Sequence, residues 1–336
     1  MISTFILLVI FFNKLSAQCS TLDSCVSCAG VTNGPFTCRW CLDTSRCVSG
    51  MMACQSSTVV SSYNCPRNIS SIVFPEFYLG TRVVPMIRAA SLVLEWEENR
   101  EILPILETLP SNGSGIIRYR NATACHVGDA SVIVVSMDSL KEVLIAFDSS
   151  MGVNEIIAQI FDFLLNRQEP YQFGGKVLTY YNSCFLTLWK VGLGNFLQAY
   201  LNGTGMKSWN ILVTGAGVGG SLASMLIPAL SSLHPLHIRL ITIGQTRTGD
   251  IEFAINVEKN AQSAFRVVVG ADLVADMPKR IGDSLDLGHH FAFEVYYPNG
   301  LSHPYIICDQ PETPTCSMGV FFKVPWLNML YLTKYD

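Results

Sequence analysis

A glycine-rich turn holds the residues of this chain whose spacing is best suited to chemistry. Residues 213–220 read Val-Thr-Gly-Ala-Gly-Val-Gly-Gly and lie between an apolar run and a helical pattern. Gly215, Gly217 and Gly220 fit G-x-G-x-x-G, the pattern that lets a backbone approach a pyrophosphate. A dinucleotide site also needs an acidic residue about twenty positions further on. The next strand instead ends with Gln245, so nucleotide binding is the weaker interpretation.

Two further interpretations of this turn concern membranes and acyl transfer. No Asp, Glu, Lys or Arg occurs between Lys207 and Arg239, which fits a spanning helix, but several glycines and Pro228 interrupt that stretch. Residues 215–219 also fit the strand-to-helix turn G-x-S-x-G, which exposes the nucleophile of lipases and esterases. Gly217 then stands in the place of the serine.

The surrounding residues favour the acyl-transfer turn. Residues 213–224 resemble the V-T-G-H-S-L-G-G-x-x-A-S stretch of the class 3 (fungal-type) lipases. Residues 242–250 resemble that family's T-F-G-Q-P-R-x-G-D, and Phe265–Val268 with Asp272–Pro278 resemble the segment that supplies the triad aspartate. The resemblance runs from near Cys125 to the C-terminus. It implies an α/β fold, namely an α/β-hydrolase-like, mostly parallel sheet flanked by helices.

The resemblance also assigns a catalytic triad, of which one member is retained. Asp272 matches the triad acid, Gly217 occupies the nucleophile position, and Asn328 occupies the histidine position. No histidine follows His303, so a shifted alignment does not restore one. Loss of a triad serine or histidine costs on the order of a millionfold in turnover. A glycine at the nucleophile position relieves the backbone strain of such a turn.

The oxyanion donors implied by the family are altered as well. Phe147-Asp148-Ser149-Ser150 matches the family's F-R-G-[ST] stretch, so Ser150 is the first donor position and the backbone N–H of Val218 is the second. A carboxylate at Asp148 would oppose a developing negative charge. Ser221 and Ser224 lie inside the helix after the turn, where we expect them to hydrogen-bond to the helix backbone.

Alternating apolar runs and helical stretches after residue 124 predict the elements that position these residues. We expect strands at Ala130–Met137, Glu142–Phe147, Trp209–Thr214, His237–Ile243, Phe265–Val269, Phe291–Tyr297 and Tyr305–Cys308. We expect helices at Ala89–Glu101, Val153–Leu165, Gly175–Leu201 and Gly219–Leu230. Val153–Leu165 resembles the family's mobile lid, with a core helix as the alternative. The predicted organisation is a signal peptide (1–17), a cysteine-rich domain (18–66), a connecting segment (67–120) and a class 3 lipase-like domain (121–336).

Eight of the twelve cysteines define the cysteine-rich domain. Few aliphatic residues accompany them, so disulfides must supply the stability that a small core lacks. Their pairing is open, and zinc ligation through the two C-x-x-C pairs is the alternative. The spacing resembles the plexin-semaphorin-integrin (PSI) module, a non-catalytic adaptor. The eight cysteines are Cys19, Cys25, Cys28, Cys38, Cys41, Cys47, Cys54 and Cys65. Beyond them we expect the disulfides Cys125–Cys184 and Cys308–Cys316.

Composition and targeting signals indicate a secreted, extracellular protein. An apolar stretch at Phe5–Phe12 precedes a small-residue site ending at Ala17, as in a signal peptide, and it is too short to span a membrane. The even cysteine count fits an oxidising compartment. The N-glycosylation motifs are at Asn68, Asn112, Asn121 and Asn202. Only 14% of residues are charged, with a formal net charge of −4, which excludes a nucleic-acid-binding protein.

The sequence therefore predicts a lipase-like protein of lipid metabolism that is catalytically inactive. Its expected partner is a lipid or fatty acyl ligand in the vestigial cleft, or an extracellular protein, and we expect no cofactor, metal or transmembrane segment. His289 and His290 lack accompanying ligands and are expected at a strand edge. One alternative is an active ester hydrolase with a non-standard nucleophile. Another is an adaptor that acts through the cysteine-rich domain.

Overall fold

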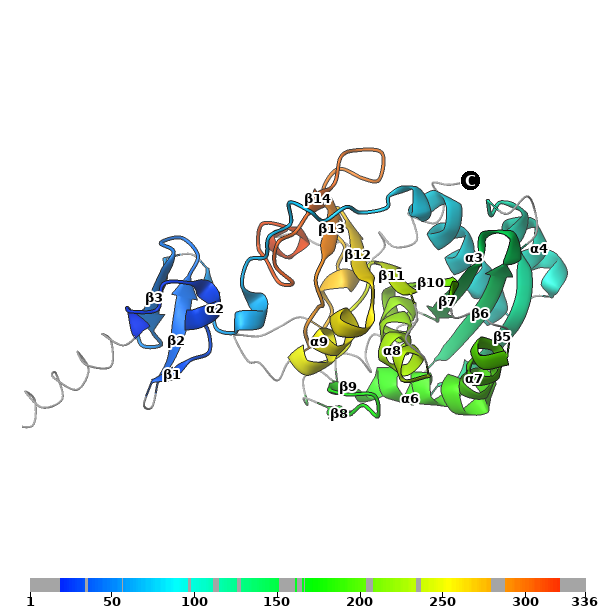
Figure 1. Ribbon diagram of the computed structural model, residues 1–336, viewed down its shortest axis with the longest axis horizontal. Helices are drawn as coiled ribbons and strands as arrows, with labels where there is room; N and C mark the ends of the chain where they lie inside the picture. Colours follow the sequence, from blue (N-terminus) through cyan, green and yellow to red (C-terminus); the bar gives the residue numbers. More distant parts are fainter. Residues whose placement is uncertain are drawn as a thin grey trace, which may run out of the picture. The chain divides into compact units, whose positions relative to one another are not determined.

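The computed structural model describes residues 19–33, 36–55, 57–95, 98–110, 115–125, 128–150, 161, 165, 167–203, 208–233, 237–278 and 288–320. The chain divides into two compact units, Met1–Asn68 and Ile69–Asp336 (Figure 1). Three predictions lie outside the described residues: the signal peptide, Asn112 and Asn328. The predicted helix Val153–Leu165 lies almost entirely outside them as well.

The smaller unit is a short antiparallel sheet held by disulfides. Strand β2 (Phe36–Cys41) pairs with β1 (Thr32–Asn33), β3 (Arg46–Ser49) and β4 (Thr58–Val59), beside helix α2 (Cys25–Cys28). The disulfides are Cys19–Cys38, Cys25–Cys65, Cys28–Cys47 and Cys41–Cys54. Since every cysteine of this unit is in a disulfide, none is available as a zinc ligand. Most of its buried apolar residues are these cysteines, packed around Trp40 and Val59.

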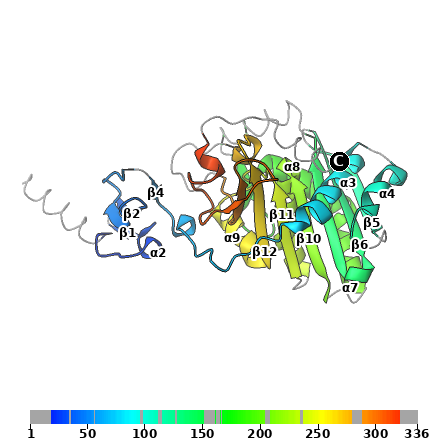
Figure 2. The same cartoon turned by 90° about the horizontal axis from the view of Figure 1, so that it is seen from above.

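The larger unit is built on an eight-stranded sheet in the order β14-β13-β12-β11-β10-β7-β6-β5 (Figure 2). The inner strands β7, β10, β11, β12 and β13 are parallel, and the strands outside them pair antiparallel. Their bounds are β5 Ile116–Ala124, β6 Asp129–Met137, β7 Glu142–Ser149, β10 Asn210–Ala216, β11 His237–Ile243, β12 Ser263–Val269, β13 Glu294–Tyr297 and β14 Ile306–Ile307. A separate pair joins β8 (Gln168–Pro170) to β9 (Lys176–Leu178).

Helices cover both faces of this sheet. On one face α3 (Val84–Leu94), with α4 (Asn99–Glu107) beside it, packs on β6 and β7. On the other face α8 (Gly217–Leu233) packs on β7, β10 and β11 and contacts α9 (Ile251–Asn260) and α6 (Thr179–Leu188). The described residues contain no helix that is long and apolar enough to cross a bilayer.

The predicted helix Gly175–Leu201 is interrupted. Its first residues form β9, and a π-helical turn at Trp189–Leu193 separates α6 from α7 (Gly194–Gly203). Gly192 within this turn leaves the helical conformation. The apolar pattern alone therefore overestimates the helix length.

Within the predicted connecting segment (67–120), residues from Ile69 onward fall in the larger compact unit. The helix predicted at Ala89–Glu101 is two helices, α3 and α4, and the core contains Ala89 and Ala90 of α3. Ser131 Oγ in β6 donates to the carbonyl of Ala90 at 2.7 Å, and β5 forms the sheet edge. The small side chains of α3 allow it to lie close to the strands. The Pro and Ser residues of the surrounding sequence suggest a linker instead.

Candidate functional site

The strand-to-helix turn lies at the carboxyl end of β10, which lies between β7 and β11 in the sheet. Strand β10 ends at Ala216 and α8 begins at Gly217, whose φ of +52° is left-handed. An L-residue with a Cβ is strained by about 1–2 kcal/mol in this region. The unfavourable backbone conformation expected of a nucleophile turn is therefore present, and the residue that adopts it has no side chain.

The neighbouring glycines are required by close backbone approach. A Cβ on Gly215 would lie 2.3 Å from the carbonyl oxygen of Gly219. A Cβ on Gly219 would lie 2.6 Å from the carbonyl oxygen of Phe147 in the adjacent strand β7. These contacts are shorter than any side chain tolerates, so the glycine pattern of this turn is explained by its shape, without a bound nucleotide.

The serines that follow the turn are fully buried in a hydroxyl network. Ser221 Oγ lies 2.6 Å from Thr246 Oγ1, which also accepts from Tyr181 Oη at 2.8 Å. Ser224 Oγ donates to the carbonyl of Ser221 at 2.7 Å, the back-bonding expected from the sequence, and lies 3.3 Å from Thr248 Oγ1. Both serines hydrogen-bond to hydroxyls and carbonyls, so neither is placed as an activated nucleophile.

The first oxyanion position is engaged in the sheet. The backbone N–H of Ser150 donates to the carbonyl of Asp129 at 2.9 Å, and its hydroxyl accepts from the N–H of Asp129 at 2.8 Å. Both groups therefore extend the β6–β7 ladder, and the N–H of Ser150 is not left for an oxyanion. Val218, the second predicted donor position, is the second residue of α8 and is 2% exposed.

Asp148 lies on the α3 side of β7. Leu144 and Ala146, two and four residues before it, belong to the core cluster that includes α3, and alternation along the strand puts Asp148 on the same face. Burial raises the pKa of Asp148 to about 7, and the charge of Glu95 at the end of α3 adds to the rise, while hydrogen bonds from Ser149 and Ser91 oppose it. The carboxyl group thus faces α3 rather than the turn.

The predicted acid, Asp272, follows β12 at the same edge of the sheet as the turn. It is 1% exposed, and its Oδ1 accepts from the N–H of Val274 at 2.9 Å. Strands β10, β11 and β12 are parallel neighbours, so the residues after them share one edge. Gly217 and Asp272 are therefore brought to the same edge. Asn328 lies outside the described residues.

A buried cluster of charges lies beyond the acid. The guanidinium of Arg247 is 2% exposed and pairs with Asp276 at 2.9 Å and Glu312 at 2.8 Å. Burial alone would lower the pKa of Arg247, but these carboxylates raise it above its usual value. The side chain of Arg266 is fully buried, pairs with Glu294 at 3.4 Å and donates to the carbonyl of Phe291 at 2.9 Å.

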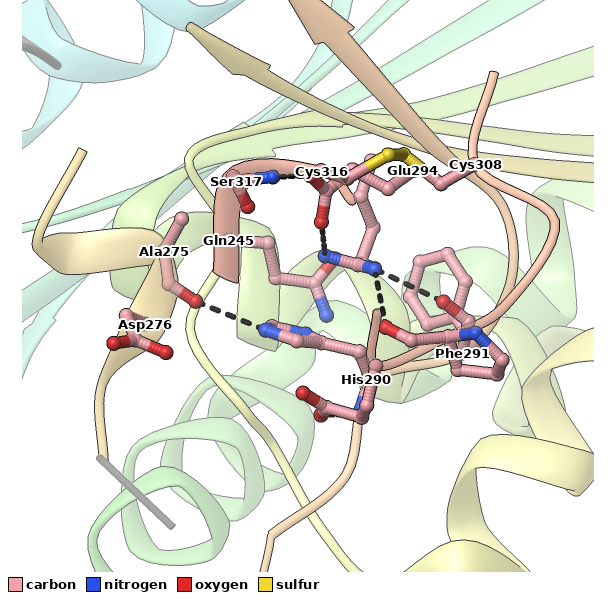
Figure 3. Close-up of polar contacts among 12 residues, drawn as sticks. Gln245, Ala275, Asp276, His290, Phe291, Glu294, Cys308, Cys316 and Ser317 are labelled. Carbon is pink, nitrogen blue, oxygen red and sulfur yellow. Dashed lines mark hydrogen bonds and ion pairs between the residues drawn. A yellow bond between two sulfur atoms is a disulfide. The ribbon is translucent and has the colours of Figure 1, made fainter. Parts of the chain in front are cut away.

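His290 borders this cluster, where Figure 3 shows its ring pointing to Ala275. Its Nε2 lies 2.9 Å from the carbonyl oxygen of Ala275. Burial, followed by the positive charge of Arg266, holds the pKa of His290 well below its usual value. The neighbouring His289 donates its backbone N–H to the carbonyl of Gly249.

The described residues contain one group of side chains spaced for a metal ion: Glu294, Cys308 and Cys316. These two cysteines are in a disulfide with each other, so the group is not a metal site. The remaining pair, Cys125–Cys184, is also a disulfide. Of the glycosylation motifs that the structure describes, Asn68 and Asn202 are exposed and Asn121, on β5, is half-buried.

Residues 144–281 match the family model described as Lipase (class 3). This part of the chain therefore resembles the class 3 lipases. The match begins within β7 and extends through the turn, Asp272 and Arg247. The α/β-hydrolase-like fold predicted from the motifs is confirmed, with a mostly parallel sheet and a disulfide-rich N-terminal region.

Curated relatives are also lipases by name. A Caenorhabditis elegans protein named Lipase ZK262.3 is 25% identical over 202 residues, which is 53% of this chain and 55% of the relative. A Rhizopus niveus lipase is 26% identical over 220 residues, 62% of this chain and 52% of the relative. This chain therefore spans about half the length of the curated relatives it matches.

Solved lipase structures share the fold. A lipase from Rhizopus microsporus var. chinensis superimposes with a TM-score of 0.57 at 19% identity, covering 75% of this chain and 83% of that chain. The Yarrowia lipolytica LIP2 lipase gives 0.60 at 15% identity, covering 74% and 90%. At these identities the likeness concerns the fold of the class 3 lipase domain and not its activity.

Sequence reasoning missed the buried charges around Arg247 and the carboxyl group that faces α3. A signal for the first existed, since Arg266 and Glu294 are charged residues within apolar strands, where an unpaired charge is costly. Glu312 lies between two paired cysteines, which is a further signal. No local pattern indicated that Asp148 faces Ser91 and Glu95, because those residues are far from it in the sequence.

Proposed function

We propose that this chain is a secreted member of the class 3 lipase family that does not hydrolyse esters and instead binds a lipid or fatty acyl chain at the carboxyl edge of its sheet. Gly217 carries the proposal. It occupies the nucleophile position with the left-handed backbone of the turn, and it has no hydroxyl to attack a carbonyl. The disulfides and the exposed motifs at Asn68 and Asn202 support secretion.

Three contacts of the surrounding residues support the loss of catalysis. The hydroxyls of Ser221 and Ser224 are committed to a buried network. The N–H of Ser150 is committed to the sheet. Removing an oxyanion donor costs about 10²–10³ in kcat, and this loss adds to the absence of the nucleophile. An alternative serine would need a base within hydrogen-bond reach, whereas Ser221 and Ser224 hydrogen-bond to hydroxyls and carbonyls.

The experiment measures acyl-chain binding and ester hydrolysis on the same purified full-length protein. We expect saturable binding of a fluorescent long-chain fatty acid, displaced by oleate and not by butyrate, whose chain is too short to bury much apolar surface. We expect hydrolysis of p-nitrophenyl butyrate at the rate of buffer alone. Absence of saturable binding contradicts the binding role. Turnover above the blank that scales with protein concentration supports the active-hydrolase alternative.

The cysteine-rich unit is a second candidate site, and its exposed apolar side chains favour it. Val26 is 66% exposed, Met51 59% and Met52 51%. Contiguous exposed apolar side chains mark interaction surfaces, and Met51 and Met52 are neighbours in the sequence. We propose on this basis, and on the PSI-like spacing, that the unit binds an extracellular protein. Met51→Glu with Met52→Glu in the full chain is expected to abolish that binding while fatty-acid binding is unchanged.

A further inference from the structure

Two segments, one after β12 and one after β14, are tied together by the buried charges. The first, residues 272–278, follows β12 and contains Asp272; we call it the acid loop. The second, residues 308–316, is closed by the disulfide Cys308–Cys316; we call it the disulfide loop. The two loops are separated in the sequence by β13 and β14. Side-chain contacts of Arg247, His290 and Glu312 connect them.

Arg247 binds the acid loop at several points. Its Nη2 donates to Asp276 Oδ1 at 2.9 Å, and its Nη1 donates to the carbonyls of Asp276 and Pro278, the latter at 3.0 Å. Its backbone N–H donates to the carbonyl of Met277 at 2.8 Å. The carbonyl of Ala275 contacts His290 at 2.9 Å. Successive residues of the acid loop are therefore held by Arg247 and His290.

Glu312, on the disulfide loop, binds both of these residues. Its carboxylate accepts from Arg247 Nε at 2.9 Å and from Arg247 Nη2 at 2.8 Å, the bidentate geometry of a strong charge-assisted pair. Its Oε1 also accepts from the backbone N–H of His290 at 3.1 Å. The carboxylate of Glu312 therefore binds both Arg247 and His290, the two residues that contact the acid loop.

Burial makes this arrangement depend on Glu312. The side chains of Arg247 and Glu312 are 2% and 4% exposed. Removing one partner of a buried pair leaves an uncompensated charge, which is strongly unfavourable. The same disulfide loop supplies the carbonyl of Pro311 to Arg266 at 3.2 Å. Displacement of this loop therefore takes a partner away from two buried guanidinium groups at once.

The disulfide restricts that displacement. Cys308 and Cys316 are 2% and 5% exposed and pack with Val268 and Ala275 in one core cluster. Figure 3 shows the disulfide beside Glu294, whose carboxylate accepts from the N–H of Ser317 at 3.0 Å. Closing a short loop reduces the number of conformations in which Glu312 is away from Arg247.

We propose that the disulfide loop is a latch on the acid loop, with Glu312 as the positioning residue and Cys308–Cys316 as the bond that keeps it closed. Opening the latch frees the acid loop while the sheet stays folded. This property is independent of whether the chain hydrolyses esters or binds a lipid, because it depends only on the contacts of Glu312 and Arg247.

The test is amide hydrogen exchange of the full-length protein, read by mass spectrometry on peptides covering residues 272–278 and, as an internal reference, β6. Glu312→Gln and the double variant Cys308→Ser/Cys316→Ser are each expected to speed exchange in the acid loop at least tenfold and to leave β6 unchanged. Cys125→Ser/Cys184→Ser is the matched control, since it removes a disulfide of the same unit that does not contact Glu312. It is expected to leave the acid loop unchanged.

Two further measurements separate positioning from a general structural role. Glu312→Asp, which keeps the charge, is expected to restore acid-loop protection in part. Combining Glu312→Gln with the Cys308→Ser/Cys316→Ser variant is expected to add little to either alone, because both open the same latch. Unchanged acid-loop exchange in Glu312→Gln overturns the proposal. Equal acceleration in β6 and the acid loop, or full additivity of the two changes, also overturns it.

Discussion

Gly215 and Gly219 approach each other so closely that a Cβ on Gly215 would lie 2.3 Å from the carbonyl oxygen of Gly219. This contact closes the strand-to-helix turn and leaves Gly217 between them. The turn therefore keeps the shape of a nucleophile turn through backbone contacts alone. The shape of the turn does not depend on a nucleophilic side chain. The class 3 lipase fold is therefore compatible with a glycine at the nucleophile position.

Gly215→Ala is expected to destabilise the protein severely. The new methyl group meets backbone atoms that cannot rotate away, and overpacking typically costs about 1–3 kcal/mol, occasionally more. Thermal unfolding followed by circular dichroism measures the effect, with Gly217→Asn as the comparison because it adds a side chain at another position of the same turn. A Tm of Gly215→Ala equal to or above that of Gly217→Asn would contradict the close approach of Gly215 to the carbonyl of Gly219.

Substitutions at Gly217 are expected to follow backbone preference. At φ +52°, Ala and Ser are strained by about 1–2 kcal/mol, whereas Asn tolerates the left-handed region better. Gly217→Ala and Gly217→Ser should therefore lower the Tm by more than Gly217→Asn does. The difference is about 2–4 °C per kcal/mol for a unit of this size. An unchanged or higher Tm for Gly217→Ala contradicts the left-handed turn.

Asp148→Asn is expected to stabilise the protein near neutral pH. The carboxyl group of the unfolded chain loses its proton near pH 4, while the folded group keeps it until about 7. The unfolded state therefore binds fewer protons across that window, and wild-type stability falls as the pH rises through it. Asp148→Asn removes this loss, so its Tm should exceed the wild-type Tm at pH 7.5 and match it near pH 4.

Asp138→Asn serves as a control of opposite sign. A hydrogen bond from Ser136, and then the contact with Arg118, holds the pKa of Asp138 below its usual value. This carboxylate is favoured in the folded state, so its contribution is present at neutral pH and is lost as the pH falls below about 4. Asp138→Asn should lower the Tm at pH 7.5. A Tm difference of the same sign for both variants contradicts the raised pKa of Asp148.

The sequence predicts the inner part of this fold better than its edges. The strands β6, β7 and β10–β12 are apolar runs bounded by turns. The glycine pattern at residues 215–220 predicts the strand-to-helix turn. The edge strand β5 alternates weakly and includes Arg118, Arg120 and Asn121, so it does not stand out from a loop. Its role depends on pairing with β6, which no local pattern specifies.

The candidate site shows the same division. Gly217 and Asp272 are identified by motif, and parallel strand order brings them to one edge of the sheet. The engagement of Ser150 with Asp129 and of Glu312 with Arg247 arises between segments far apart in the chain. Such pairs follow from tertiary packing, so they become visible only when the strands and loops are in place.

The central claim is tested most directly by a fluorophosphonate probe, which labels an activated serine covalently. The purified full-length protein, with an active class 3 lipase as the positive control, is incubated with the probe and analysed by intact-mass spectrometry. We predict no adduct on the wild-type chain, because Gly217 has no hydroxyl and Ser221 and Ser224 are buried in their network. Stoichiometric labelling of any serine would contradict the account.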